Sequence, residues 1–181
     1  MYTPTIVFAF IGLFSLDQPQ WVKDYSLARQ HGKEQRKPLA VFVASGKTGW
    51  DKISQEGQLD KEVHKILAAH YVCVYVDADK APGERLANAF ELTDRLGLVI
   101  SDGTGALQAF WHAGGLANED LVKYLLRYAD PQRVTRRTET TSPNGIRAIE
   151  QAPEATIRQA GYYSPPSGYY PAHEGGGGRS C

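Results

Sequence analysis

The chain has 181 residues, with 20 basic and 20 acidic side chains and a formal net charge of zero at pH 7. This length predicts one globular domain with appended segments, and the balanced charge argues against a nucleic-acid surface or a strongly acidic substrate. The two cysteines, Cys73 and Cys181, are far apart and the five histidines are scattered, which argues against a disulfide framework and against a zinc or other metal site.

The N-terminal segment 1–17 contains an uncharged apolar run over residues 6–16. This run is too short to cross a bilayer as a helix. It is similar to the core of a secretory signal, with Ser15 as a small residue near a cleavage point. However, no Lys or Arg precedes it, and Leu13 fills the other small position. Cleavage, membrane attachment and packing as a strand or arm remain alternatives, so location stays open between export or the cell envelope and the cytoplasm.

Residues 18–130 carry the periodic patterns of a folded domain. Continuous apolar runs predict strands buried on both faces, and apolar positions three or four apart predict amphipathic helices. An Asp-Gly turn at 102–105 between two β-rich runs predicts a hairpin. The expected elements are a helix within 18–36, a strand at 39–44, a helix from about Trp50, a helix at 59–70, a strand at 71–76, a helix at 82–92, strands at 96–101 and 106–112, and a last helix capped by Asn118.

The composition changes after residue 130, and residues 131–181 are predicted to be a low-complexity, disordered tail. This segment contains Gly-Tyr-Tyr twice and four consecutive glycines, and it ends in Cys181. A helix within 146–159, interrupted by Pro153, is an alternative for its first part. The tail is interpreted as flexible, in preference to a specific contact with an aromatic groove.

In this order of elements the chain resembles the thioredoxin-like superfamily, and its bacterial branch above all. The resemblance covers residues 21–128 and rests on Lys37-Pro38, on the strands at 41–44 and 72–76, on the Asp-x-Asp at 77–79 and on the hairpin at 99–103. It implies an α/β fold, a three-layer α/β/α sandwich with a central mixed sheet of four to five strands.

The resemblance also implies where the redox site of that family would lie. Lys47 and Trp50 stand at the positions of its two cysteines, Thr48 and Gly49 lie between them, and Leu96 stands at the position of its cis-proline. Disulfide exchange requires an attacking thiolate and a resolving thiol. The resemblance therefore implies a site without catalytic residues, and these five positions become the candidate binding surface.

Three other features of the sequence have a chemical interpretation. Residues 46–48, Gly-Lys-Thr, resemble the end of a phosphate-binding loop, but Val41 stands where that loop requires a glycine, so we expect no nucleotide and no other cofactor. Cys73, between valines, is predicted to be a buried, unreactive thiol. Asp77 and Asp79 are interpreted as turn and capping residues in preference to a cation site.

Single side chains of the candidate surface also have simpler interpretations. Lys47 is interpreted as a solvated turn lysine in preference to an anion contact at a helix N-terminus. Trp50 is interpreted as cover for the core in preference to an anchor for a partner.

The expected function is a redox-inactive thioredoxin-like domain that acts as a protein-binding or structural module. The alternative is a thiol–disulfide oxidoreductase or other thiol enzyme that uses Cys73 or Cys181 at an unusual site. Because the cysteine pair is missing, we favour a protein that is not an enzyme. A passive role in an envelope assembly is a third expectation, if residues 6–16 anchor the chain. A protein partner is expected, without its identity, and nucleic acid is not.

Overall fold

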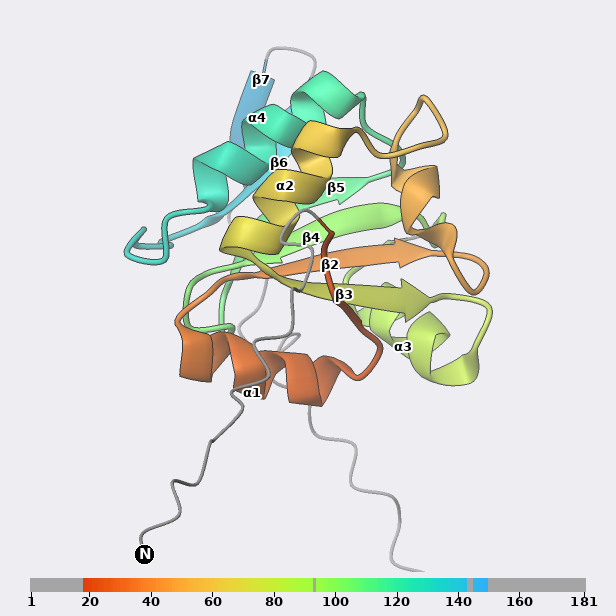
Figure 1. Cartoon of the computed structure of the whole chain (residues 1–181), viewed down its shortest axis with the longest axis horizontal. Helices are drawn as coiled ribbons and strands as arrows, with labels where there is room; N and C mark the ends of the chain where they lie inside the picture. Colours follow the sequence, from red (N-terminus) through yellow and green to blue (C-terminus); the bar gives the residue numbers. More distant parts are fainter. Residues whose placement is uncertain (1–17, 93, 143–144, 150–181) are drawn as a thin grey trace, which may run out of the picture.

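The structure of the chain, a computed structural model, describes residues 18–92, 94–142 and 145–149 (Figure 1). Within these residues it is an α/β domain with four α-helices and one mixed sheet. None of the described helices is both long and apolar enough to span a bilayer. The predictions for segment 6–16, for Cys181 and for the tail from residue 150 onward lie outside the described residues.

The elements of the domain alternate between strands and helices over most of its length. In chain order they are β1 (Trp21–Val22), α1 (Tyr25–Gln35), β2 (Leu39–Ala44), the 3-10 helix η1 (Gly49–Ile53), α2 (Lys61–His70), β3 (Val72–Asp77), α3 (Ala81–Ala89), β4 (Gly97–Ser101), β5 (Gln108–Ala113), α4 (Asn118–Tyr128), β6 (Thr138–Ser142) and β7 (Gly145–Ile149).

The strands form one sheet in the order β1-β3-β2-β4-β5-β6-β7, in which β1 has only two residues and the other six have five or six. β1, β3 and β2 are parallel neighbours. β4 is antiparallel to β2, and β5 is antiparallel to β4. β6 runs parallel to β5, and β7 antiparallel to β6. The carboxyl ends of β1, β3 and β2 therefore lie at one edge of the sheet.

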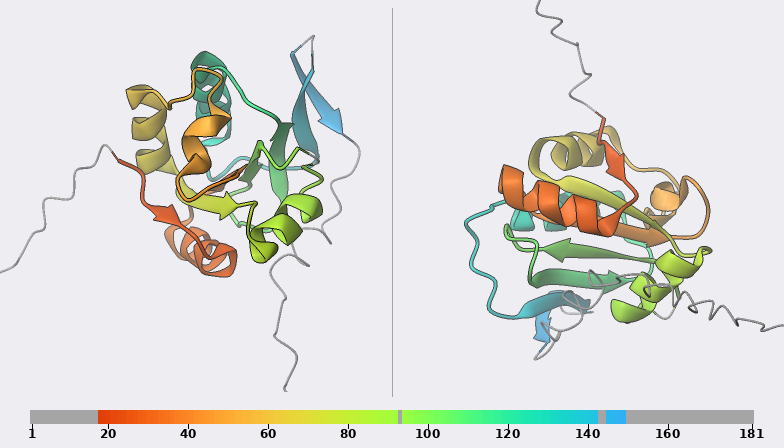
Figure 2. Two further views of the ribbon diagram at one scale, coloured as in Figure 1. Left: turned by 90° about the vertical axis from the view of Figure 1, so that its right-hand side faces the viewer. Right: turned by 90° about the horizontal axis from the view of Figure 1, so that it is seen from below.

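Helices cover both faces of the sheet, α2 and α4 on one and α1 and α3 on the other (Figures 1 and 2). Alternate residues of β2 enter two separate cores. Ala40, Phe42 and Ala44 pack in the core under α2 and α4. Val41 and Val43 pack in the core under α1 and α3. Because a strand side chain alternates between faces, burial on both sides requires the continuous apolar run from which β2 was predicted.

Most of the elements predicted within 18–130 are confirmed, with two corrections. The predicted helix within 18–36 begins only at Tyr25, where Asp24 caps it by accepting a hydrogen bond from the Leu27 amide (2.9 Å). Trp21–Val22 before it pairs with β3 as a strand. The cap of α4 was also predicted wrongly, because Asn118 is the first helical residue and its side-chain amide donates to the Gln58 carbonyl (3.0 Å).

The prediction of four to five strands, with the folded part ending at residue 130, is corrected by β6 and β7, which extend the sheet to seven strands. Figure 2 shows the two strands at the edge of the sheet far from β1. Within 146–159, the residues up to Ile149 belong to β7 rather than to a helix. The β6 sequence, Thr-Glu-Thr-Thr-Ser, lacks the alternation of apolar and polar residues from which a strand is predicted. Polar contacts hold this strand instead. Glu139 of β6 accepts hydrogen bonds from Arg127 (2.9 Å) and Arg133 (3.2 Å).

Candidate functional site

Four of the five residues of the candidate binding surface lie in the segment 45–50, which we call the 45–50 turn and which runs from the end of β2 into η1. It leaves the sheet at the carboxyl edge shared by the parallel strands, where ligands of open α/β sheets commonly bind. Ala44, the last residue of β2, lies beside Asp77, the last residue of β3. The register therefore brings the side chains at the end of β3 next to the 45–50 turn.

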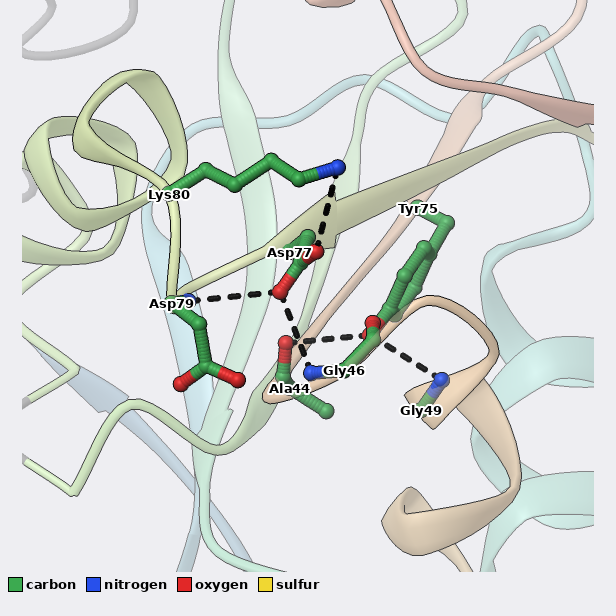
Figure 3. Close-up of polar contacts among 7 residues, drawn as sticks. All are labelled: Ala44, Gly46, Gly49, Tyr75, Asp77, Asp79 and Lys80. Atoms are coloured by element: carbon green, nitrogen blue, oxygen red, sulfur yellow. Dashed lines mark hydrogen bonds and ion pairs between the residues drawn. The ribbon is translucent and has the colours of Figure 1, made fainter.

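The hydroxyl of Tyr75 on β3 contacts the backbone at two points of the 45–50 turn and at the end of β2 (Figure 3). It accepts a hydrogen bond from the amide of Gly49 (3.0 Å) and lies within donating distance of the carbonyl oxygens of Ala44 (3.1 Å) and Gly46. A Cβ on Gly49 would overlap this hydroxyl, so the close approach requires glycine. Desolvation raises the pKa of Tyr75, which keeps the phenol protonated and able to donate.

The carboxylate of Asp77 binds the other end of the same turn. Its Oδ1 accepts hydrogen bonds from the backbone amides of Gly46 (3.0 Å) and Asp79 (3.3 Å), and its Oδ2 lies 3.4 Å from Nζ of Lys80. Gly46 has a φ of 98°, a left-handed conformation that glycine adopts without strain. Desolvation raises the pKa of Asp77, but these hydrogen bonds and Lys80 outweigh it and leave the pKa below its usual value. Asp77 thus has the turn role predicted for it.

Trp50 closes the turn against an aromatic cluster. Its ring stacks on Trp21, with centroids 5.1 Å apart and planes 18° apart, and meets the edge of Tyr75 at 5.2 Å. Trp21 in turn packs edge to face on Phe42 (5.1 Å). Both tryptophans are half-buried. Trp50 therefore covers the core, as interpreted from the sequence, while part of its surface stays accessible beside the turn.

The structure gives the five predicted site residues different environments. Lys47 and Thr48 are exposed at the tip of the turn, whereas Gly49 is buried and Trp50 is half-buried. Leu96 precedes β4, at the same edge of the sheet, and packs with Trp50 against the same core cluster. Every peptide bond among the described residues, including those of Leu96, is trans.

Cys73 lies within β3, away from the end of the strand that faces the turn. It is 2% exposed, and its Sγ lies 3.7 Å from the carbonyl oxygen of Leu67. Burial raises the pKa of the Cys73 thiol to about 12, although nearby Lys37 lowers it. The prediction that Cys73 is a buried structural residue is confirmed, since a protonated and covered thiol is a poor nucleophile.

Sequence reasoning missed Tyr75 and Trp21 as parts of the site, and it missed an adjoining pocket. The pocket has a volume of about 190 Å³ and is lined in part by Lys23, Lys47 and Lys80. The positions of the three lysines in the sequence could have indicated the pocket, because each lysine follows the carboxyl end of a different parallel strand. No group of three or more His, Cys, Asp or Glu side chains arranged to hold a metal ion occurs among the described residues.

Comparison of the chain with models of protein families, with curated proteins and with solved structures finds no match. The functional assignment therefore depends on the geometry of the site. That geometry is a turn at the carboxyl edge of the sheet, held by two side chains of β3, with Lys47 and Thr48 exposed at its tip.

Proposed function

We propose that this chain is a thioredoxin-like domain without redox activity that binds a protein partner through the 45–50 turn. The strand order β1-β3-β2-β4-β5, with β4 and β5 antiparallel to their inner neighbours, is consistent with this fold assignment. The helices on both faces of the sheet are also consistent with it. On this proposal, β6 and β7 are an addition to the five-stranded unit.

The observation that carries the proposal is how the 45–50 turn is held. The side chains of Tyr75 and Asp77 bind its backbone, and Lys52 donates a hydrogen bond to the Ser45 carbonyl oxygen (2.9 Å). The exposed side chains of Lys47 and Thr48 are not needed to keep its shape. A surface whose conformation is fixed before binding loses less entropy when a partner docks. The half-buried ring of Trp50 adds an aromatic surface of the kind that anchors protein interfaces.

Affinity capture with two double variants tests the proposal. In Lys47→Ala/Thr48→Ala, both changes affect the turn tip, and neither residue supports its conformation. The matched control, Lys61→Ala/Lys65→Ala, removes exposed charges from α2 instead. We expect the turn variant, and not the control, to lose a discrete set of proteins in quantitative mass spectrometry, and the purified proteins of that set to bind the wild type directly. Identical capture by wild type and turn variant would contradict the proposal.

Thiol chemistry is the competing function, and the burial of Cys73 weighs against it. An insulin-reduction assay with dithiothreitol separates the two, with Cys73→Ser and Cys181→Ser as variants. We expect the wild type to add nothing to the background rate. Robust activity that either substitution removes would contradict the binding-module proposal.

A further inference from the structure

The pocket beside the 45–50 turn is built by the ends of three neighbouring parallel strands. Lys23 directly follows β1, Lys47 lies in the turn after β2, and Lys80 lies in the turn between β3 and α3. Because β1, β3 and β2 run in the same direction, their carboxyl ends bring these lysines to one edge of the sheet. The convergence is a product of topology, since the three residues are far apart in sequence.

The lining of the pocket has unbalanced charge. Three lysines and one carboxylate, Asp77, contribute to it. Asp77 is already engaged by Lys80 at 3.4 Å and by the backbone amides of Gly46 and Asp79. Like charges that converge on one concave surface repel each other, and an anion placed among them relieves that repulsion.

The remainder of the lining adds an apolar wall and the start of a helix. Val76 is buried, Leu86 is half-buried, and the ring of Pro82 lies beside them in the lining. α3 begins at Ala81 with no side-chain cap on its N-terminal amides. Uncapped amides at the start of a helix favour negative charge nearby, which adds to the effect of the lysines.

The size of the pocket limits the ligand. At about 190 Å³ it is smaller than the pockets of about 300 Å³ and more that enclose drug-sized ligands or nucleotides. We propose that the pocket formed by Lys23, Lys47 and Lys80 binds a small organic anion, a carboxylate or phosphate group on a short apolar body. The anionic group contacts the lysines and the start of α3, and the apolar body packs on Val76 and Leu86. This inference does not rest on the proposed protein-binding function.

A titration followed by two-dimensional ¹⁵N–¹H NMR tests the pocket with four probes: phenyl phosphate, benzoate, inorganic phosphate and the neutral benzyl alcohol. We expect saturable shifts of the backbone amides of Gly46, Asp79 and Gly83 with phenyl phosphate or benzoate at millimolar concentrations. Inorganic phosphate should bind more weakly because it lacks the apolar body, and benzyl alcohol should produce no saturable shift. The ratio of the phenyl phosphate and benzoate affinities identifies the preferred anionic group.

Variants separate the pocket from general surface charge. Lys23→Ala/Lys47→Ala should weaken binding of the better probe about tenfold, whereas Lys61→Ala/Lys65→Ala, with the same loss of charge on α2, should change it less than about twofold. Lys23 lies outside the 45–50 turn, so Lys23→Ala alone tests the pocket without touching the proposed partner surface. Equal weakening by both double variants would overturn the proposal, as would equal binding of benzyl alcohol or no saturable shift with either organic anion. Saturable binding of a glutamate-rich peptide, without binding of the small anions, would also overturn it by assigning the pocket to an acidic protein segment.

Discussion

Two polar clusters of this domain each contain a tyrosine hydroxyl and a carboxylate, yet they hold different kinds of groups. The first consists of Tyr75 and Asp77 at the carboxyl edge of the sheet, and it binds the backbone of the 45–50 turn (Figure 3). The second, which we call the Glu139 cluster, joins Glu139 of β6 to Tyr128 and Arg127 of α4 and to Arg133. Its members bind one another through their side chains.

This difference separates a surface that is available for binding from one that is committed to the fold. In the Glu139 cluster, Arg127 and Tyr128 attach β6 to α4, Arg133 attaches the segment between them, and the Tyr128 side chain is buried. In the first cluster two side chains of β3 bind the backbone of the turn, and they leave Lys47 and Thr48 exposed at its tip. The cluster that fixes this backbone therefore leaves the sequence free at the exposed positions 47 and 48, although the turn still requires glycine at 49.

The largest effect is expected from Glu139→Ala. The substitution removes the acceptor of the Tyr128 hydroxyl, which keeps only its contact with Arg127, and it leaves Arg127 and Arg133 without their carboxylate. We expect the free energy of unfolding to fall by about 2–3 kcal/mol, since a hydroxyl that loses its acceptor costs about 1–3 kcal/mol and the half-exposed ion pairs add less. Urea denaturation measures the loss, and faster amide exchange in β6 would locate it.

Two control variants accompany this prediction. Glu139→Gln keeps an acceptor for Tyr128 and should lose clearly less stability than Glu139→Ala. Glu34→Ala removes an exposed carboxylate that accepts a hydrogen bond from Gln30 on its own helix, and its effect should stay within about 0.5 kcal/mol. If Glu139→Ala were as mild as Glu34→Ala, the Glu139 cluster would not be what holds β6.

A smaller loss is expected from Tyr75→Phe, which removes the hydroxyl and keeps the ring contacts with Trp21 and Trp50. The backbone groups of the turn lose one shared partner, and we expect about 1–2 kcal/mol of destabilisation. Faster amide exchange at Gly49 should accompany it, together with weaker partner binding. Tyr124→Phe is the matched control, because the Tyr124 hydroxyl makes no hydrogen bond to another described residue. Equal effects of the two substitutions would show that the Tyr75 hydroxyl does not organise the turn.

Pattern alone could predict the scaffold of this site but not what holds it. The strand at 39–44 and the turn after it were predicted correctly, because burial on both faces leaves an uninterrupted apolar run. The pattern treats Tyr75 as one more apolar residue of the strand at 71–76, since periodicity does not reveal which backbone groups a hydroxyl reaches. The pattern places Trp21 in a helix, because a strand of two residues has no detectable period.

The edge of the sheet was missed for a different physical reason. β6 is stabilised by hydrogen bonds of Thr138 and Glu139 with residues of β5 and α4 rather than by an apolar face. Such contacts between distant residues leave no mark on local hydropathy. The boundary at residue 130 therefore followed the end of the apolar pattern, whereas the sheet continues beyond it.

Acid is expected to destabilise the Glu139 cluster less than the Glu139→Ala substitution does, because protonation of Glu139 removes its charge but leaves an oxygen that can accept a hydrogen bond. Desolvation raises the pKa of Glu139, but its hydrogen bonds with Tyr128 and Arg127 and the charges of Arg127 and Arg133 outweigh it and hold the pKa below the ordinary value of 4.5. A carboxyl whose pKa is lower in the folded state contributes stability that is complete above the unfolded value and is lost as pH falls through the folded value.

Stability should thus fall below about pH 4.5, and Glu139→Gln should flatten this decline by removing one of the titrating groups. Urea denaturation at several pH values from neutral to acid compares the two proteins. Part of the decline should persist in the variant, since the pKa of Asp77 is also lowered. Parallel pH profiles for wild type and Glu139→Gln would contradict the contribution of Glu139.

Substitutions at the tip of the 45–50 turn are expected to have the smallest effect on stability and the largest effect on partner binding. Lys47→Ala and Thr48→Ala each change an exposed side chain in a turn whose shape depends on Tyr75 and Asp77, so the free energy of unfolding should change by less than about 0.5 kcal/mol. If the 45–50 turn is a contact surface, the same substitutions should reduce affinity for the captured partner severalfold. A loss of stability comparable to that of Tyr75→Phe would mean that the turn depends on its own side chains, and the distinction between the two clusters would fail.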